Sequence, residues 1–370
     1  SQRHEVSAVS FFENEGESRY ISELKQFCRR VVVVRRYPYP PAVGPLRLMP
    51  WQIAAEFGAP EMAAAIHDAL SADDFDIVQC EYLQMAYLMP RLRREVTVLK
   101  EHEVQYAALW KRLRRQPNPL KSAVPALHWL KWLQAEVALC RRFDRVIAVT
   151  PEDRRMLGLF DPSLKVEVIE AAVDTDYFQP QDIAEEENSL VYVGAYRHYP
   201  NVDAACYLVE EILPLVRTVI PEVKLYLVGS AGSTELPQHV RQEPGVTVTD
   251  WVEDIRPWLA RASVGVFPIR LGVGIRGKIL QAWGMGKAVV STTLGAAGLG
   301  PRHGENVWIA NDTHDFAQGV MKLLQDPDLR RKLGAGARAR VVERYGQQAW
   351  IGRYEQLYYD LVQERGRLLP

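Results

Sequence analysis

Short apolar runs, rich in β-branched residues, recur along the whole chain and alternate with stretches whose apolar residues repeat at helical spacing. In the first half of the sequence these runs lie at 6–12, 31–34, 76–80, 96–100, 145–150 and 166–169. In the second half they lie at 190–194, 225–229, 246–249, 264–268, 288–292 and 307–310. Strands that alternate with helices in this way predict parallel sheets with helices on both faces.

The alternation runs twice, and a polar, acidic stretch without a strand pattern, 174–189, separates the two series. We interpret this stretch as a linker. The sequence therefore predicts an α/β protein with two Rossmann-like, doubly wound domains, at 1–180 and 188–345, and a ligand-binding cleft at the carboxyl ends of their sheets. Apolar residues at helical spacing in 346–370 predict a final helix that crosses back and packs on the first domain.

The composition fits two globular domains in a reducing compartment. With 370 residues and a hydrophobic fraction of 48%, the chain is long enough for two cores. The net charge of −1 gives no general attraction to nucleic acids or anionic lipid. The four cysteines lie far apart in apolar contexts, which is typical of buried free thiols. Because neither a signal peptide nor a membrane-spanning apolar run is evident, we expect a cytoplasmic protein.

One segment departs from this neutral balance. Residues 91–145 hold 13 Lys and Arg against 5 Asp and Glu, and over 109–133 the cations interleave with Trp110, Trp129 and Trp132. One interpretation is a peripheral segment that contacts the inner face of the cell membrane near a lipid-linked acceptor. The other is a solvated basic face whose tryptophans belong to the core. No fold signature supports a nucleic acid partner.

The segment PIRLGVGIRG, residues 268–277, carries the strongest sign of chemistry. It follows a predicted strand and precedes a predicted helix, and Gly272 and Gly274 permit close backbone approach and unusual φ angles. The first N–H groups of the helix can bind a phosphate, and Arg276 and Lys278 can add positive charge beside it. One turn later, Gln281 can hydrogen-bond a ribose or sugar hydroxyl. The alternative is an ordinary glycine turn next to two solvated cations.

Six segments follow one another along the chain in an order that is typical of one family. They are VIAVTPEDRRML (146–157), VIEAAVDTDYFQP (168–180), LVYVGAYRHYPNVDA (190–204), LYLVGS (225–230), VTVTDWVEDIRPWLARASVGVFP (246–268) and GVGIRGKILQAWGMGKAVVST (272–292). Together they resemble the landmarks of the retaining glycosyltransferases of the GT-B fold, family 4. The resemblance covers nearly the whole chain, and it is specific because the segments follow one another in the family's order.

The resemblance implies an enzyme that moves a sugar from a nucleotide sugar, most simply a UDP- or GDP-sugar, to an acceptor hydroxyl with retention of configuration. In such enzymes the leaving phosphate itself generally serves as the base, and neither a metal nor a cofactor is expected. The acceptor implied is a cell-surface glycan or its lipid-linked precursor.

The resemblance also assigns residues to the donor. The positions that match donor-binding positions of the family are Gly194, Arg197, Val252, Gly272, Gly274, Ile275 and Gln281. The nucleobase would lie near the turn at Trp251 and Val252, the diphosphate on the backbone N–H groups of 274–276, and the ribose at Gln281. Arg276 and Lys278 would stabilise the leaving diphosphate, which makes them catalytic candidates.

Two further candidates come from the first half of the chain. His102, in KEHEVQY, matches a histidine that faces the donor in the family, and it would hydrogen-bond the transferring sugar or its phosphate. The alternative is a surface histidine at a strand end. Glu81, at another strand end, is a candidate contact of the acceptor, and the alternative for this residue is a capping or salt-bridge role.

The chain departs from the family pattern in three places. Val273 and Gln281 replace the two glutamates of the E-x7-E signature, and Ala171–Ala172 stands where Asn-Gly is usual. The chain also opens at what corresponds to the second strand, so either a leading segment is absent from the sequence or the domain is rebuilt. Two other functions therefore stay open: a catalytically degenerate GT-B protein that binds a nucleotide or a partner, and a nucleotide-sugar epimerase.

Overall fold

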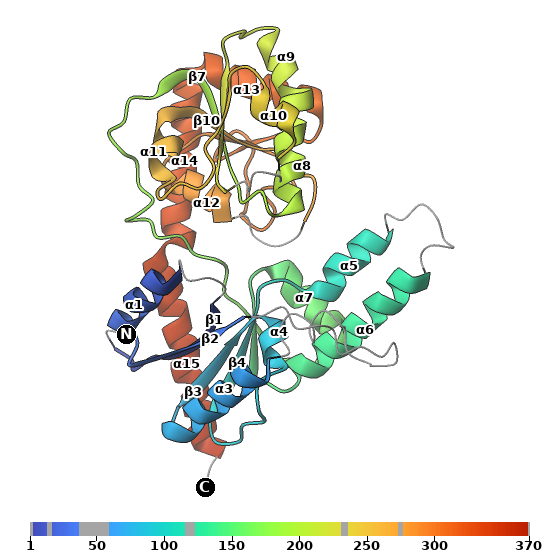
Figure 1. The fold of residues 1–370 in the computed structure, drawn as a ribbon, viewed down its shortest axis with the longest axis vertical. Helices are drawn as coiled ribbons and strands as arrows, with labels where there is room; N and C mark the ends of the chain where they lie inside the picture. The colour runs from blue at the N-terminus through green and yellow to red at the C-terminus, as the bar shows by residue number, and fades with distance from the viewer. Residues whose placement is uncertain are drawn as a thin grey trace. The chain divides into compact units, whose positions relative to one another are not determined.

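The computed structural model describes residues 3–12, 17–36, 59–114, 123–230, 236–272 and 277–368. The chain divides into two compact units, and each combines parallel strands with helices in the alternation that the sequence predicts (Figure 1). Unit 1 comprises Ser1–Val168 and Gln356–Pro370, and unit 2 comprises Ile169–Glu355. The predicted α/β class with parallel sheets is confirmed.

Over its described residues, unit 2 contains one six-stranded parallel sheet in the order β12-β11-β10-β7-β8-β9. Its strands are β7 (Glu186–Val193), β8 (Lys224–Val228), β9 (Val246–Val248), β10 (Ala262–Phe267), β11 (Val289–Ser291) and β12 (Trp308–Ile309). Every residue of the central strand β10 is buried, as expected where helices cover both faces. The strand order reverses between β7 and β10, and ligands of doubly wound sheets bind at such a switch point.

Two of the helices in unit 2 begin at capping aspartates. Asp312 and Asp326 each accept a hydrogen bond from the backbone N–H three residues on, at 2.9 Å, and so cap the helices that begin at Thr313 and Pro327. The helical segments are α8 (Tyr199–Tyr207), the π-helical turn η3 (Leu208–Ile212), α9 (Leu213–Arg217), α10 (Gln238–Gln242), α11 (Arg256–Arg261), α12 (Gly277–Gly284), α13 (Thr313–Gln325) and α14 (Pro327–Tyr345).

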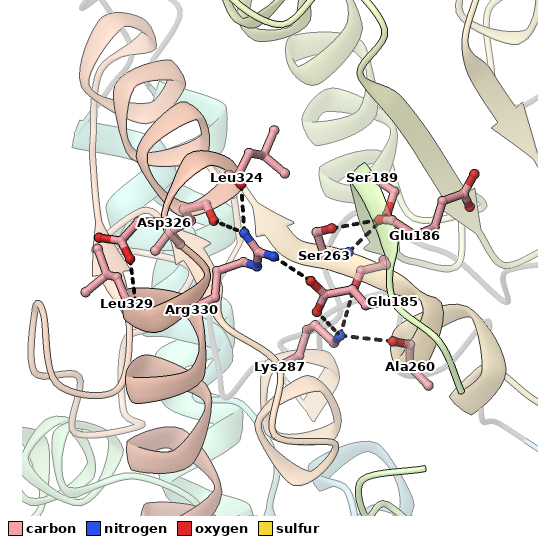
Figure 2. Close-up of polar contacts among 12 residues, drawn as sticks. Glu185, Glu186, Ser189, Ala260, Ser263, Lys287, Leu324, Asp326, Leu329 and Arg330 are labelled. Atoms are coloured by element: carbon pink, nitrogen blue, oxygen red, sulfur yellow. Dashed lines mark hydrogen bonds and ion pairs between the residues drawn. The ribbon is translucent and has the colours of Figure 1, made fainter. Parts of the chain in front are cut away.

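A polar network joins the amino ends of the central strands in unit 2 (Figure 2). The buried Lys287 donates to the carbonyl oxygens of Ala260 at 3.0 Å and Ala262 at 2.5 Å, and it pairs with Glu185 at 3.5 Å. Arg330 of α14 bonds the other carboxylate oxygen of Glu185 at 2.8 Å. Burial lowers the pKa of Lys287, although the charge of Glu185 works in the opposite direction. Because this network lies at the amino edge of the sheet, away from the switch-point loops, we interpret it as structural.

The prediction that 174–189 is a strand-free linker is wrong at its carboxyl end, since β7 begins at Glu186. The Glu186 carboxylate accepts from Lys224 at 2.6 Å, and its carbonyl accepts from the Ser263 hydroxyl at 2.7 Å. Earlier in the stretch, Arg338 of α14 donates to the carbonyl of Phe178 at 2.7 Å. Contacts that are distant in sequence therefore order an acidic segment whose local pattern indicates a loop.

Over its described residues, unit 1 contains two parallel sheets. The first pairs β1 (Ser7–Phe12) with β2 (Arg30–Arg35), and the second has the order β3-β4-β5-β6. The strands of the second sheet are β3 (Ile77–Glu81), β4 (Val96–Glu101), β5 (Arg145–Ala148) and β6 (Val166–Val168). Val9, Phe11 and Val34 of the small sheet pack against the hydrophobic core of the larger one, so both sheets share one core.

The helices of unit 1 include the predicted final helix. They are α1 (Ser18–Phe27), α3 (Pro60–Ala72), α4 (Leu83–Ala86), α5 (Gln105–Arg114), α6 (Ala123–Cys140), α7 (Pro151–Phe160) and the end of α15 (Gln347–Leu368). Near its end, α15 contacts the sheet of this unit: Glu364 accepts from Arg145 at 3.1 Å, and Arg365 bonds Asp144 at 3.4 Å. The chain thus returns to the first unit, as predicted. No helix of the described residues is long and apolar enough to cross a membrane.

Candidate active site

In unit 2, the described donor candidates lie along the carboxyl edge of one sheet. Gly194 and Arg197 follow β7, Val252 follows β9, and Gly272 follows β10. Gly272 has a φ of 100°, which confirms the expected unusual backbone and which a residue with a Cβ adopts only with strain. Because β7 and β10 are direct neighbours, their two loops meet at the switch point.

Lys278 and Gln281, one turn apart on α12, lie on the half-buried face of a helix whose residues 279–280 and 282–284 are buried. The Lys278 ammonium donates to the Asn201 side-chain oxygen at 2.5 Å and lies 5.2 Å from the centre of the Tyr192 ring. Asn201 in turn donates to the carbonyl of Ala195 at 2.7 Å. This arrangement fixes a cation of α12 beside the loop that follows β7, close to the positive end of the helix.

The loop that leads to Gly272 is held by a residue that our sequence analysis missed. The Arg270 guanidinium forms a bidentate pair with Asp203 of α8, at 2.8 and 3.1 Å, and stacks 4.0 Å above the Tyr207 ring. The charge of Asp203, through this hydrogen bond, raises the pKa of Arg270. A single arginine in a loop gives no sequence signal for such a contact, because its partner lies 67 residues away.

In unit 1, the structure brings together the two candidates of the first half of the chain. Glu81 ends β3, and His102 follows directly on the neighbouring strand β4. The His102 Nε2 atom lies 2.6 Å from the Glu81 carboxylate, and the Lys100 ammonium lies 3.7 Å from the same oxygen. The Tyr82 ring stacks on the imidazole, with 4.1 Å between the ring centres. Tyr82 has a φ of 71°, a backbone strain of the kind that clusters at functional sites.

The electrostatics of this pair determine which imidazole nitrogen faces a ligand. Burial of Glu81 works to raise its pKa, but the hydrogen bond from His102, the charge of Lys100 and a hydrogen bond from Gln79 at 2.5 Å together lower it. The carboxylate is therefore ionised at neutral pH and only accepts hydrogen bonds. His102 must then donate through Nε2, which leaves Nδ1 as the nitrogen that can meet a sugar or phosphate oxygen.

Comparisons with known proteins agree with this architecture. Residues 1–177 match the family model for Glycosyltransferase Family 4, and residues 187–326 match the model for Glycosyl transferases group 1. The chain belongs to the GT-B glycosyltransferases. The N-acetyl-alpha-D-glucosaminyl L-malate synthase of Bacillus anthracis is 23% identical over 191 residues, which cover 49% of this chain and 48% of that protein. The chain thus matches about half the length of this curated relative.

Two solved GT-B structures show the same fold over nearly the whole chain. The sucrose-phosphate synthase of Thermosynechococcus elongatus superposes with a TM-score of 0.68 and 16% identity, covering 97% of this chain and 99% of that one. HepE of Anabaena, in complex with UDP and glucose, superposes with a TM-score of 0.67 and 14% identity, covering 96% of this chain and 99% of that one. At such low identity, the likeness concerns the fold alone.

Part of the phosphate-binding prediction for this GT-B glycosyltransferase falls outside the described residues. Val273, Gly274, Ile275 and Arg276 belong to 273–276, which the structure does not describe. Their roles stay predictions. Among the described candidates, Arg197 is exposed and Gly194 is buried in the loop that follows β7.

The GT-B glycosyltransferase also has polar residues behind the Glu81–His102 pair that our sequence analysis missed. Tyr358 of α15 donates a hydrogen bond to the Gln79 side-chain oxygen, and Gln79 donates to Glu81.

A second group missed from the sequence is a pair of buried carboxyl groups. Directly before His102, Glu101 is buried beside Glu136 of α6. Burial and the neighbouring Glu136 raise the pKa of Glu101 well above its usual range, and burial raises the pKa of Glu136 to about 7.

Proposed function

We propose that this protein transfers a sugar from a nucleotide-sugar donor, a UDP- or GDP-sugar, to a hydroxyl of a glycan or lipid-linked acceptor. The observation that carries the proposal is the switch point of unit 2, where a glycine with positive φ precedes α12 and its oriented Lys278. The names of two similar proteins support the substrate class: one is an N-acetylglucosaminyl malate synthase, and the other was solved with UDP and glucose.

On the donor side, Lys278 stabilises the leaving diphosphate. Negative charge grows on the phosphate oxygens as the glycosyl bond breaks, and a cation already held in place by Asn201 needs little reorganisation to meet it. The N–H groups at the start of α12 add the positive end of the helix dipole. Gln281 lies one turn further along the same face, where its amide binds the ribose hydroxyls.

On the side of the transferring sugar, His102 supplies a hydrogen bond whose direction is set by Glu81. The ionised carboxylate keeps the proton on Nε2, so Nδ1 accepts from a sugar hydroxyl, or, when the imidazole is protonated, donates to a phosphate oxygen. We further propose that transfer proceeds with retention, that the leaving phosphate acts as the base, and that no metal takes part. Addition of EDTA then leaves turnover unchanged.

The decisive test is the stabilisation of the protein by a panel of free nucleotides and UDP-, GDP-, ADP- and dTDP-sugars. A nucleotide at about 100 times its dissociation constant adds about 2.7 kcal/mol to the free energy of unfolding. We expect one base to stabilise the wild type and to do so much less in Lys278→Ala. The matched control is Lys332→Ala, an exposed lysine of α14. If no nucleotide stabilises the wild type, the donor site is absent and the proposal fails.

A second assay separates transfer from the other two functions. With the stabilising nucleotide sugar, a transferase forms product only when acceptor is added, an epimerase changes the donor without acceptor, and a degenerate binding protein does neither. Glycan and lipid-linked acceptors are offered in parallel. We expect acceptor-dependent release of the nucleotide diphosphate with an α-linked product from an α-linked donor, and a β-linked product would overturn retention.

A further inference from the structure

Tyr82 joins strand β3 to the short helix α4 through a backbone conformation that is rare for a tyrosine. Its φ of 71° and ψ of 137° lie in a part of the dihedral map that is essentially restricted to glycine. The backbone is held there on both sides. Its N–H donates to the Lys100 carbonyl at 3.1 Å, and its carbonyl accepts from the Met85 N–H at 3.1 Å and from the Cys80 thiol at 3.7 Å. The surrounding fold therefore imposes this conformation, which a glycine would adopt at a lower cost.

The strained conformation presents the Tyr82 ring to solvent instead of to the core. Directly after it, Leu83 and Ala86 of α4 are buried, whereas Tyr82 is 52% exposed. One face of its ring stacks on the His102 imidazole, with 4.1 Å between the ring centres and 19° between the ring planes. Because that face is covered, the exposed area lies on the other face and on the ring edge. A half-exposed aromatic ring on a strained backbone, next to a candidate catalytic residue, indicates a surface that binds a ligand.

The position of the ring separates its ligand from the group that His102 meets. The hydrogen bonds of an imidazole lie in the plane of its ring, so an oxygen bound to Nδ1 lies in that plane. Tyr82 lies above the plane, and a group on the outer face of Tyr82 is two stacking distances away from the imidazole. A sugar at that place is therefore a neighbour of the transferring sugar and lies on the acceptor side of the new bond.

Glu81 supplies a polar group beside the ring. Its side chain is 45% exposed, and the carboxylate is ionised at neutral pH. One carboxylate oxygen contacts His102 and Lys100, and the other accepts from Gln79 at 2.5 Å. Because a carboxylate has about four acceptor sites, it can also accept from a hydroxyl group of a ligand. An apolar ring next to a hydroxyl acceptor is complementary to a pyranose, which carries C–H groups on its face and hydroxyl groups at its edge.

We propose that the acceptor stacks a pyranose ring on the outer face of Tyr82, while Glu81 accepts a hydrogen bond from one of its hydroxyl groups. The acceptor is therefore a glycan, and its class excludes hydroxy acids and small alcohols, which have no apolar face to place on the ring. This inference rests on the proposed function, because it names the acceptor class of the same transfer. All the contacts that carry it lie within unit 1, between β3, β4 and α4.

The test is saturation-transfer NMR of the purified full chain with the methyl glycosides of glucose, galactose, mannose and N-acetylglucosamine, and with UDP and GDP in the same samples. We expect transfer to the C–H protons on one face of at least one glycoside, and none to glycerol or L-malate. Tyr82→Phe should keep this signal because the ring remains, whereas Tyr82→Gly should weaken glycoside binding about tenfold through the loss of the stacked ring. The nucleotide signals report the donor site independently.

A further comparison separates the ring from the backbone and from His102. Tyr82→Gly should unfold at a higher temperature than Tyr82→Ala, since both lack the ring and only glycine adopts this backbone without strain. In turnover with the glycoside that accepts sugar, Tyr82→Gly should raise the KM for the acceptor about tenfold, with kcat and the KM for the donor little changed. A ring that served only to orient His102 would lower kcat instead, and that result would overturn the proposal.

The matched control is Tyr359→Ala, a change in an equally exposed tyrosine of α15 whose ring lies beside His4, and this variant should bind glycosides like the wild type. The proposal is overturned if no glycoside receives saturation from the wild type, or if Tyr82→Gly keeps the full signal. It is also overturned if glycerol or L-malate shows the same dependence on Tyr82. Glycoside signals that depend on Tyr82, in a wild type that shows no nucleotide signals, would support the sugar site and overturn the proposed transfer.

Discussion

Unit 2 and unit 1 use the same alternation of strands and helices, but they differ in how completely their strands pair. In unit 2 the described strands form one sheet, and its central strand β10 is buried along its whole length. In unit 1 the pair β1–β2 is separate from the four-stranded sheet β3–β6, although both pack on one core. Because parallel sheets draw their stability from burial on both faces, we infer that unit 2 is the more stable unit.

The two units also differ in how they bury charge. The buried Lys287 of unit 2 has an opposite charge, Glu185, and two carbonyl oxygens as partners. In unit 1, Glu101 and Glu136 are two buried carboxyl groups side by side; burial disfavours the ionisation of both, and Glu136 further disfavours that of Glu101. In unit 2 the buried charge is thus compensated by fixed partners. In unit 1 the free energy of unfolding depends on whether the buried carboxyl groups are protonated.

The largest expected effect is on the packing of unit 2. A Cβ added to Gly334 of α14 would lie 2.1 Å from the backbone oxygen of Gly286, and a backbone atom cannot move aside cheaply. Gly334→Ala should therefore lower the free energy of unfolding of unit 2 by about 3 kcal/mol. Hydrogen exchange of peptides from β10, measured at increasing urea concentrations, gives this loss and assigns it to unit 2.

The control for this change is Gly158→Ala in α7 of unit 1, where an added Cβ meets nothing within 4 Å. That substitution should leave unit 1 equally stable or stabilise it by up to about 1 kcal/mol, because alanine favours the helix. If Gly334→Ala and Gly158→Ala lower the free energy of unfolding of their units to the same extent, the close contact at Gly334 is not the cause of the loss in unit 2.

The next prediction compares the loss of one candidate residue from each unit, His102 and Lys278. His102→Ala should lower kcat about 100-fold with little change in KM, because the proposed contact of this residue is with the transferring group. Lys278→Ala should also weaken donor binding, roughly tenfold, since the diphosphate that it is proposed to bind is already present in the ground state. Steady-state kinetics with the identified nucleotide sugar measure both. The exposed His67→Ala of α3 is the control, and an equal loss in that variant would refute a special role of His102.

Much of the fold was predictable because a buried parallel strand requires a continuous run of apolar residues, which is visible in the sequence. The run 264–268 consists of apolar residues on both sides of the strand, and β10 occupies Ala262–Phe267. Likewise, Asp326 precedes a proline and a helical pattern, and it caps α14. The start of β7 was missed because its acidic residues gain strand partners only from β8 and β10.

The candidate site was predictable to a smaller extent. The sequence places Glu81 and His102 at strand ends, but their 2.6 Å contact depends on β3 and β4 being neighbours, which no local pattern determines. The buried pair Glu101–Glu136 was missed for a similar reason. Glutamate is usually exposed, and only the fold, which brings Glu136 of α6 beside Glu101 at the end of β4, takes both carboxyl groups out of water.

That pair leads to a prediction on pH. A carboxyl group whose pKa is raised in the folded state binds more protons there than in the unfolded chain. The free energy of unfolding of unit 1 should therefore fall as pH rises from the ordinary value of 4.5 to about 7, the pKa of Glu136, and above it for Glu101. The slope is at most about 1.4 kcal/mol per pH unit for each proton. Hydrogen exchange of peptides from β4, in urea at several pH values, measures it.

Glu101→Gln should remove the part of this slope that lies above about pH 7 and stabilise unit 1 there, because an amide cannot ionise, whereas the part due to Glu136 below pH 7 should remain. Glu103 and Asp153 add negative charge nearby, and Glu103→Gln, which leaves the buried pair intact, should keep most of the slope on both sides of pH 7. A wild-type unit 1 that is equally stable at pH 5 and pH 8 would show that the two carboxyl groups are not coupled to folding.

The smallest effect concerns two serines at the amino edge of the unit 2 sheet, drawn in Figure 2. The hydroxyl groups of Ser189 and Ser263 both donate to the Glu186 carbonyl, at 2.5 and 2.7 Å, but Ser189 alone also accepts from the Ser263 N–H at 3.0 Å. Ser263→Ala should cost less than about 1 kcal/mol, because the carbonyl keeps one donor. Ser189→Ala leaves a buried N–H without an acceptor and should cost about 1–2 kcal/mol more. Urea unfolding of both variants measures the difference, and equal losses would mean that the Ser263 N–H finds another acceptor.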